Sequence, residues 1–516
     1  MAIIYEIKKR RVIPNWRDYK RTLQIGELGL HHPNSLDINI NRIINDWSTS
    51  KNIGTAAELI SAAFISNKTN FSELTEAISL IKENSSNSSS ALLSLIDSIE
   101  RPTNVKSNEQ TSKFLLEKDI DTIDDFQAFI NNKSLFKVIH RTKNRSKNEM
   151  FNPIVWVELA RLYTMHGQEG KAERALLTAL HLAPDNRFVL RSATRFFIHT
   201  DQFEKALYYL RKSKSLKYDP WLISAHIATS SIMDRFSPLI KDGEKLILSN
   251  NFSPFELTEL YSSLGTLEFN DGSFKKAKQL FNKSMIQPND NTLAQMEWVS
   301  KEDSRFSFNP FVYETVINPF EAYALDHYEN GNWEGAFYNC VKWFLDMPFS
   351  KRPILLGSYI AGSLLKDKNA SILLCEVGLQ ANPHDPALLN NIIYELATSG
   401  NLDQANKYIN QIREINMASL TNECKVTIQA TLGLVALRNK KFPIGKKLYE
   451  LAIENAGRMK SNYLKNLAII NYARELLIAN QPEKEEYFNI IKNMVLDDKH
   501  KDLIELRKEA LEYKNY

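Results

Sequence analysis

Small and apolar residues recur along this chain at a regular interval of about 34 residues, and this repetition constrains the fold more than any other feature. Ala206 lies one such interval after Ala172, and Phe197 lies one such interval after Tyr163. A unit of this length cannot bury its apolar face alone, so successive copies must stack on one another. Stacking also explains how 516 residues fold without one very large core.

Each unit has the pattern of two short helices joined by a turn. Trp156, Leu159 and Tyr163 recur at helical spacing and form one apolar stripe. Gly167 ends that helix because glycine tolerates a left-handed turn, and Pro184 stops the second helix. The apolar stripe of the second helix consists of Ala172, Leu176 and Ala179.

These residues resemble the tetratricopeptide repeat, whose signature is W-x2-L-G-x2-Y, then A-x3-F, then P within one repeat unit. Ala160 replaces the small glycine of the signature, and Leu176 replaces its aromatic residue. Further copies lie near Tyr261, Phe320 and Leu432, whereas the signature positions cannot be placed at 214–257 and 285–318. The resemblance implies an all-α protein, an α-solenoid of antiparallel helix pairs that form a right-handed, TPR-like superhelix.

The pattern predicts four regions. Residues 1–50 are a basic N-terminal arm with one short strand at 3–7 and otherwise irregular structure. Residues 51–140 form a helical N-terminal region, residues 150–460 the solenoid, and residues 461–516 capping helices. Residues 101–112 and 140–150 are expected to be linkers.

Charge and cysteine content narrow the class of protein. The 65 basic and 61 acidic side chains leave a net charge of +4, too small to indicate nucleic-acid binding by itself. The cysteines form no CxxC pair and are expected to be reduced, packed thiols. We find neither a signal-peptide pattern nor an apolar run of membrane-spanning length, so we expect a cytoplasmic protein with no membrane partner.

Patterns that carry catalysis are missing from the sequence. It contains no GxxxxGK[ST], GxGxxG, GxSxG or HExxH motif. The adjacent His31 and His32 precede a proline in a loop, and the acidic residues at 119–125 fit the start of a helix. We therefore expect a protein that is not an enzyme, with no catalytic residues, no metal site and no cofactor.

The N-terminal arm combines basic and aromatic side chains. Such a combination can dock on the chain's own solenoid or on a partner protein, or it can bind phosphates and stack on bases. Docking is the favoured alternative, and nucleic acid is the second. The residues concerned are Lys8, Lys9, Arg10, Arg11, Trp16 and Arg17.

The family resemblance also implies a partner-binding groove, because the first helix of each pair lines the concave surface. Positions between the signature residues would place Arg161, Arg191 and Arg195 in a basic patch, with His199 beside it. Bidentate arginines suit carboxylate or phosphate groups. Asn390 and Tyr394 would face the groove of a later pair. A solvated helix face is the alternative for all six.

Some family members hold a C-terminal carboxylate with a lysine and an asparagine in the first pair. Val157 and Arg161 occupy those places here, which argues against that clamp. The favoured function is a scaffold or adaptor that binds an acidic partner surface through the concave face, as a subunit of a multi-protein complex. The alternatives are a nucleic-acid-associated or regulatory factor, such as a sensor in a bacterial multi-component system, and an enzyme with an unrecognised site. No oligomeric state is assigned.

Overall fold

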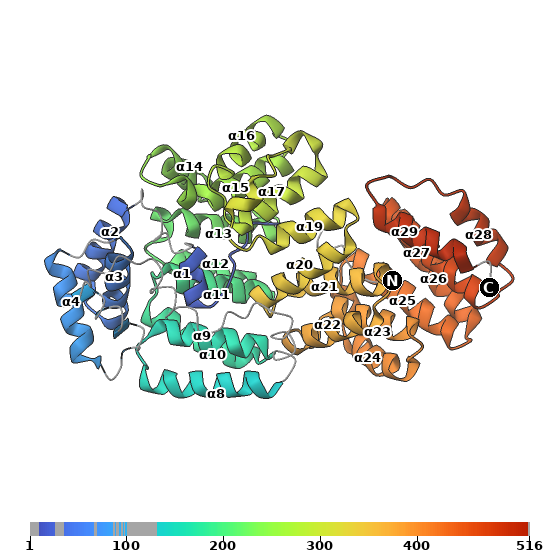
Figure 1. Cartoon of the computed structure of the whole chain (residues 1–516), viewed down its shortest axis with the longest axis horizontal. Coiled ribbons are helices and arrows are strands. Elements are labelled where there is room, and N and C mark those ends of the chain that lie inside the picture. The colour runs from blue at the N-terminus through green and yellow to red at the C-terminus, as the bar shows by residue number, and fades with distance from the viewer. Residues whose placement is uncertain are drawn as a thin grey trace. The chain divides into compact units, whose positions relative to one another are not determined.

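The computed structural model describes residues 10–25, 36–66, 70–85, 88, 92–93, 96, 99–100 and 132–513. Every regular element in these residues is helical, as predicted (Figure 1). The chain divides into two compact units. The N-terminal unit is Arg11–Pro319, and the C-terminal unit is Met1–Arg10 together with Phe320–Tyr516. Lys8, Lys9, the strand predicted at 3–7, His31, His32 and the acidic residues at 119–125 lie outside the described residues.

Helix pairs follow one another in chain order through the N-terminal unit. Its first helices, α9, α11, α13, α15 and α17, contact one another in sequence. The pairs are α9 (Pro153–Met165) with α10 (Glu169–Leu182), α11 (Arg187–His199) with α12 (Phe203–Lys212), α13 (Pro220–Ile232) with α14 (Ile240–Leu248), and α15 (Pro254–Asn270) with α16 (Phe274–Ser284). In place of a full second helix, α17 (Asp290–Glu302) is followed by short turns that include α18 (Val312–Thr315).

Local sequence signals account for the ends of these helices. The side chains of Asn152, Asn186, Asp219, Ser253 and Asn289 each accept a hydrogen bond from a backbone N–H in the first turn of a first helix. Gly167 adopts the predicted left-handed conformation with a φ of 66°, and Asp201 takes the equivalent place with a φ of 56°.

The stretch 214–257, where the signature positions could not be placed, contains the helix pair α13 and α14. One expectation of irregular structure is wrong. The expected linker at 140–150 is helical as far as Asn148, because α8 (Asn132–Asn148) buries Leu135 and Ile139 one turn apart and contacts α9. The sequence obscured this helix because residues 140–148 contain no apolar side chain that would mark a buried face.

The start of the chain is also more helical than expected for a largely irregular arm over 1–50. α1 (Tyr19–Ile25) and α2 (Leu36–Thr49) precede α3 (Ile53–Ser66) and α4 (Ser72–Glu83). Ile43 and Trp47 of α2 share a buried apolar cluster with Leu59 and Leu74, so α2 belongs to this small helical bundle.

The C-terminal unit repeats the pairing. Its helices are α19 (Phe320–Asn330), α20 (Trp333–Asp346), α21 (Lys351–Tyr359), α22 (Lys368–Ala381), α23 (Pro386–Thr398), α24 (Leu402–Glu414), α25 (Asn422–Arg438), α26 (Phe442–Arg458), α27 (Asn462–Ile478), α28 (Lys484–Lys492) and α29 (Lys501–Glu512). The last three agree with the helices expected after residue 460. Cys340, Cys375 and Cys424 are buried, as predicted for packed thiols.

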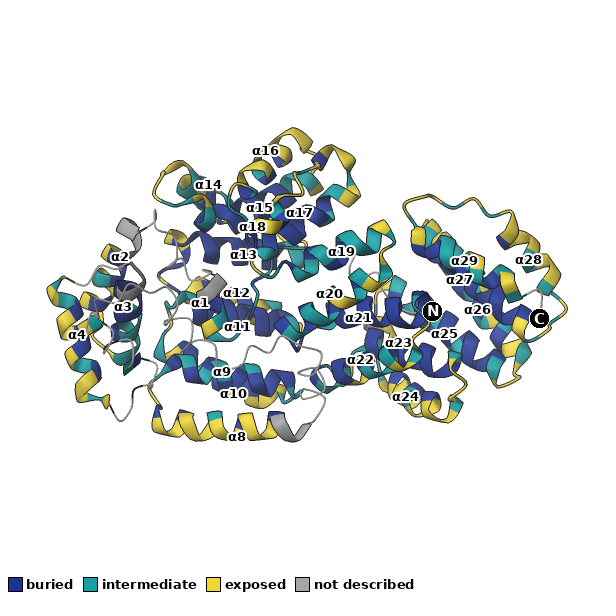
Figure 2. Cartoon of the chain, viewed as in Figure 1, coloured by how far each residue is buried: buried dark blue, intermediate teal, exposed yellow. Residues whose placement is uncertain are grey.

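The two helices of a pair differ in how far their side chains are buried. α11 buries Phe188 to Ile198 without a break, whereas α12 buries only Ala206, Leu207 and Leu210 (Figure 2). First helices therefore lie between neighbouring elements, and second helices face solvent along one side. Among the described helices, none combines the length and apolarity needed to cross a bilayer.

Candidate functional site

A buried ion pair joins two first helices of the N-terminal unit. Arg191 of α11 donates to Glu259 of α15 through both terminal guanidinium nitrogens, at 2.7 Å and 3.1 Å. The exposed fractions of the two side chains are 4% and 0%. The Arg191 guanidinium also lies 4.8 Å from the centre of the Trp221 ring, a cation–π distance.

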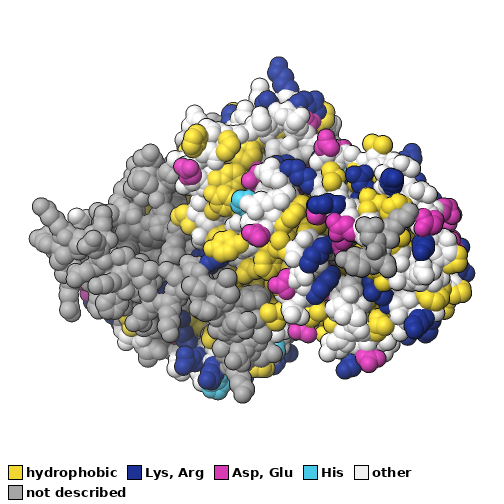
Figure 3. Space-filling view, turned by 45° about the vertical axis from the view of Figure 1, so that its right-hand side comes forward, with side chains coloured by type: hydrophobic (Ala, Val, Ile, Leu, Met, Phe, Trp, Pro, Cys, Tyr) yellow, Lys and Arg dark blue, Asp and Glu magenta, His cyan; other side chains and the backbone are white. Residues whose placement is uncertain are grey.

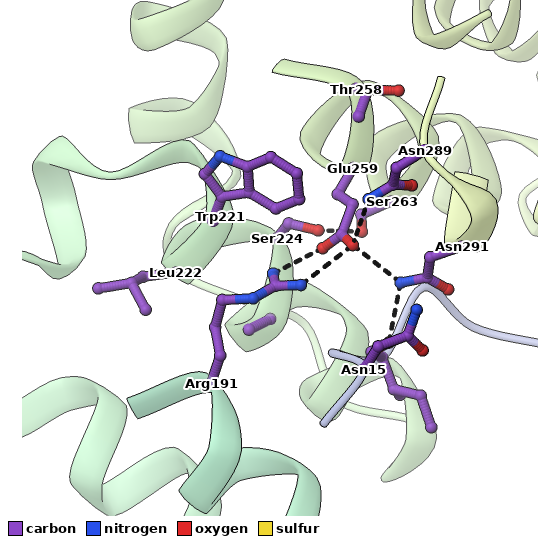
Figure 4. A network of polar contacts seen from close by, with 12 residues as sticks. Asn15, Arg191, Trp221, Leu222, Ser224, Thr258, Glu259, Ser263, Asn289 and Asn291 are labelled. Atoms are coloured by element: carbon purple, nitrogen blue, oxygen red, sulfur yellow. Dashed lines mark hydrogen bonds and ion pairs between the residues drawn. The ribbon is translucent and has the colours of Figure 1, made fainter. Parts of the chain in front are cut away.

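Glu259 in turn holds the start of α17 (Figure 4). The amide nitrogens of Asn289 and Asn291 donate to Glu259 Oε1 at 3.1 Å and 3.0 Å. The amide of Asn291 also donates to the backbone carbonyl of Ile13 at 2.9 Å. One asparagine thus connects the buried ion pair to the N-terminal arm.

Asp290, next to Asn291, also contacts the N-terminal arm. Its carboxylate accepts a hydrogen bond from Asn15 at 3.1 Å and forms an ion pair with Arg17. Arg17 is 1% exposed, and this carboxylate compensates its buried charge. A helix N-terminus normally favours an acidic residue, and here that residue also binds the arm.

The arm residues alternate between buried and partly exposed positions. Val12, Pro14 and Trp16 are buried, and the residues between them are less so. This two-residue period is that of an extended chain. Trp16 is fully buried and meets the ring of Phe196 edge to face, at 6.2 Å between ring centres.

The far end of this segment reaches α9. The backbone N–H of Tyr19 donates to Glu158 at 2.8 Å, and Arg161 pairs with the same carboxyl group at 3.3 Å. Burial raises the pKa of Glu158, although Arg161 opposes the shift. Burial also raises the pKa of Tyr19 to about 12. The Tyr19 ring packs on Phe188 at 5.2 Å.

Residues 11–22 therefore lie along the first helices, and we call them the arm segment. Arg11 begins it, donating to Ser231 of α13 at 2.7 Å. The residues that receive the segment come from α9, α11, α13 and α17, and we call them the arm site. They are Glu158, Phe188, Phe196, Ser231, Asp290 and Asn291.

The preceding residue, Arg10, is held within the C-terminal unit. It donates to both oxygens of Glu321, at 3.0 Å and 2.7 Å, and Arg352 donates to the same carboxylate at 2.9 Å. Although burial acts to raise the pKa of Glu321, the two guanidinium groups outweigh it and lower that pKa to about 2.

The predicted exposed basic patch is wrong in its main point. Arg191 is sealed in its ion pair, Arg195 is 7% exposed, and Arg161 is paired with Glu158. His199 is partly exposed at the end of α11. The physical reason is that a carboxylate neutralises each of the two arginines. Glu158 precedes Arg161 by three residues on the same helix, whereas Glu259 lies 68 residues from Arg191 and the sequence could not place it there.

The predicted groove positions of the C-terminal unit are also buried. Asn390 is 0% exposed and Tyr394 is 2% exposed. The hydroxyl of Tyr394 donates to Asn471 at 2.9 Å and accepts from Arg474 at 3.2 Å. Tyr394 thereby joins α23 to α27, so the expectation of an exposed groove at these two positions is wrong.

Sequence reasoning missed Glu259, Asp290 and Asn291. One signal was present, because Arg191 and Glu259 are 68 residues apart, twice the repeat interval. Equivalent positions two repeats apart that carry opposite charges can meet inside a solenoid. Asp290 and Asn291 resemble ordinary helix-start residues, and nothing in the sequence connects them to the arm.

The stacked helix pairs, with first helices in mutual contact, define a TPR-like α-solenoid. A scan against protein-family models finds no match, and a search of curated proteins finds none. Solved structures similar to this chain include yeast Tom70, at 15% identity over 75% of this chain and 94% of that chain with a TM-score of 0.29. The APC/C hetero-tetramer Cut9–Hcn1 is 14% identical over 95% and 99%, with a TM-score of 0.44. A human IFIT1 dimer with PPP-AAAA is 12% identical over 94% and 96%, with a TM-score of 0.34. The assignment of the fold depends on this chain's own helix pairs.

The ion pair between Arg191 and Glu259 gives the first prediction. Glu259→Gln leaves the buried guanidinium without a counter-charge, and we expect it to lower the free energy of unfolding by about 3–5 kcal/mol. Replacing both residues, as Arg191→Met with Glu259→Met, should cost less than the single change. Urea unfolding followed by tryptophan fluorescence measures both. Glu314→Gln, at an exposed position of the same unit, is the control. A loss below about 1 kcal/mol for Glu259→Gln would contradict the assigned role.

Titration of Glu321 gives the second prediction. Its folded pKa of about 2 lies below the ordinary value of 4.5, so its contribution is complete above pH 4.5 and declines as the pH falls towards 2. Between pH 6 and pH 3.5 the loss from this one group should be about 1 kcal/mol. Glu321→Gln should lack this component in urea unfolding at the two pH values. Glu334→Gln, exposed in the same unit, should retain it. Equal pH dependence in both variants would exclude Glu321 as the cause.

Proposed function

We propose that this chain is a non-catalytic scaffold or adaptor that binds a segment of a partner protein through the concave face of its solenoid, as a subunit of a multi-protein complex. The carrying observation is that an extended polypeptide, residues 11–18 of the arm segment, already lies against first helices of the N-terminal unit. Asn291 binds its backbone, and Asp290 and Phe196 contact its side chains. A face that accommodates one extended segment has the chemistry to accommodate another.

The charges of the arm site revise the kind of partner. The sequence favoured an acidic partner because Arg161, Arg191 and Arg195 lie on first helices. Arg161 and Arg191 are paired with Glu158 and Glu259, so they offer little free positive charge. Glu158 and Asp290 instead face the arm segment. We therefore propose a partner with a basic segment rather than an acidic one.

Site-specific crosslinking tests this proposal. A photo-reactive amino acid placed at His199, at the end of a first helix, should label a partner protein in native lysate. The same amino acid at Arg174, exposed on the second helix α10, should label that partner at least tenfold less. Full-length chain is used in both cases. Equal labelling from the two positions, or no discrete product from His199, would contradict binding through this face.

A second candidate function, nucleic-acid binding, is favoured by one specific surface. On the face drawn in Figure 3, basic and acidic side chains lie among one another. Such a mixed surface does not favour a polyanion such as nucleic acid. α8 differs, because the sequence of this helix contains six lysines and arginines and no acidic residue. Lys137, Arg141, Lys143 and Lys147 are exposed, and none of the four forms an ion pair with another residue in the described part of the chain. Arg10 and Arg17 of the arm are paired with carboxylates, so α8 is the better candidate for phosphate contacts.

Charge reversal on α8 tests this candidate. Lys137 and Arg141 are four residues apart and share one helix face. We expect the double change Lys137→Glu with Arg141→Glu to weaken binding of a fluorescent 30-nucleotide RNA at least tenfold, by anisotropy at 50 mM salt. The matched change Lys275→Glu with Lys278→Glu, on exposed positions of α16, should alter it less than threefold. Binding by the wild type that does not weaken at 200 mM salt would count against a phosphate contact.

A further inference from the structure

The arm site selects its ligand by residue type, and the arm segment indicates which types it takes. We infer that this site recognises an extended basic segment of a partner protein in which a tryptophan is directly followed by an arginine, and that the arm segment occupies the site until such a partner displaces it. The inference depends on the proposed function and deepens it by naming the chemistry of the partner.

The backbone of the ligand is recognised by an amide whose position is fixed. Asn291 donates to the carbonyl of Ile13 at 2.9 Å while it donates to Glu259 at 3.0 Å. Because Glu259 is held by Arg191, the Asn291 amide cannot turn away without losing a buried contact. A contact with a backbone carbonyl is independent of the ligand's side chain at that position. This contact therefore favours an extended chain without specifying its sequence there.

Sequence selectivity comes from the next part of the segment. Neighbouring side chains of an extended chain point in opposite directions. Trp16 meets Phe196 of α11, and Arg17 meets Asp290 of α17. The two side chains are 0% and 1% exposed, so each fills a site of its own. Two such sites on opposite sides of one extended stretch require a large aromatic residue and a cation in succession.

Charge complementarity supports a basic ligand. The arm segment carries Arg11, Arg17, Lys20 and Arg21 against a single carboxylate, Asp18. Glu158 and Asp290 receive its backbone and its arginine. An acidic peptide would place its own carboxylates beside Glu158 and Asp290. Burying negative charges next to one another opposes binding.

Tethering explains why the arm segment occupies the site. A segment that belongs to the same chain as its site acts at a raised effective concentration, because its binding is intramolecular. A free peptide of the same sequence must compete with it and so binds the intact chain weakly. Releasing the arm segment removes this competition while every residue of the arm site remains in place.

Charge reversal at Arg17 provides the test. In full-length chain, Arg17→Glu opposes Asp290 and should release the arm segment. A fluorescent peptide with the sequence of residues 10–22 should then bind at least tenfold more tightly than it binds the wild type. Peptides with alanine in place of Trp16 or Arg17 should lose at least tenfold of that affinity. The control is Lys20→Glu, which makes the same charge change at an exposed arm position and should bind the peptide as weakly as the wild type does.

A charge exchange tests the pairing itself. Chain carrying Asp290→Lys should prefer the peptide with Arg17→Glu over the unmodified peptide. A residue that only stabilises the fold would not change this preference. If Arg17→Glu chain binds all peptides equally, or binds none while remaining folded by circular dichroism, the inference is overturned.

A second measurement uses chain with an otherwise intact arm, in case the released variant does not fold. The three native cysteines are buried, so a dye can be attached selectively at Lys20→Cys. Excess peptide 10–22 should lower the dye anisotropy in a saturable manner, because the arm segment leaves its site. The alanine-for-tryptophan peptide should not. No change up to millimolar peptide overturns the inference.

The two proposals fail in different ways. A partner crosslinked from His199 but not displaced by peptide 10–22 would leave the scaffold function standing and overturn the assigned ligand chemistry. Displacement of the crosslinked partner by the peptide, but not by its alanine variants, would support both.

Discussion

The ion pair between Arg191 and Glu259 is the interaction on which the organisation of the N-terminal unit depends. Both side chains are almost completely buried, and neither charge can be left alone without a large loss of stability. Glu259 also accepts from Asn289 and Asn291, so the start of α17 is fixed with respect to α11 and α15. Asn289 also caps α17. The Glu259 carboxylate therefore positions both the start of this helix and the Asn291 amide that contacts the arm.

The arm segment binds next to this ion pair because each part of it meets a complementary group. Asn291 binds backbone, Asp290 binds a guanidinium group, and Phe196 packs on an indole ring. The basic and aromatic character that first suggested nucleic acid is therefore used on the chain's own helices, at least for Trp16 and Arg17. The exposed lysines and arginines of α8 remain the candidate surface for contacts with a phosphate backbone. The scaffold and nucleic-acid candidates thus concern different parts of one unit.

Several elements could be predicted because they depend on local rules. Gly167 adopts the expected left-handed turn, and the chain continues as helices after residue 460, as expected. Predictions failed where a local pattern was weak or ambiguous. α8 resembled a linker because only Leu135 and Ile139 mark its buried face among basic residues. Asn390 and Tyr394 resembled groove residues, but the partner of the Tyr394 hydroxyl lies on α27, almost eighty residues further on.

The sequence by itself determined the helix pairs and their repetition, since apolar spacing, small residues and turn residues act within a single repeat unit. It also determined that the arm carries charge and aromatic surface. Only the tertiary structure decided which of these charges are paired inside the chain and which face solvent. Arg191 meets a carboxylate 68 residues away, and Arg17 meets one 273 residues away. A helical pattern gives the side of a helix on which a residue lies, but not what lies opposite. The charge that the first helices present is therefore a property of the assembled solenoid, not of any one repeat.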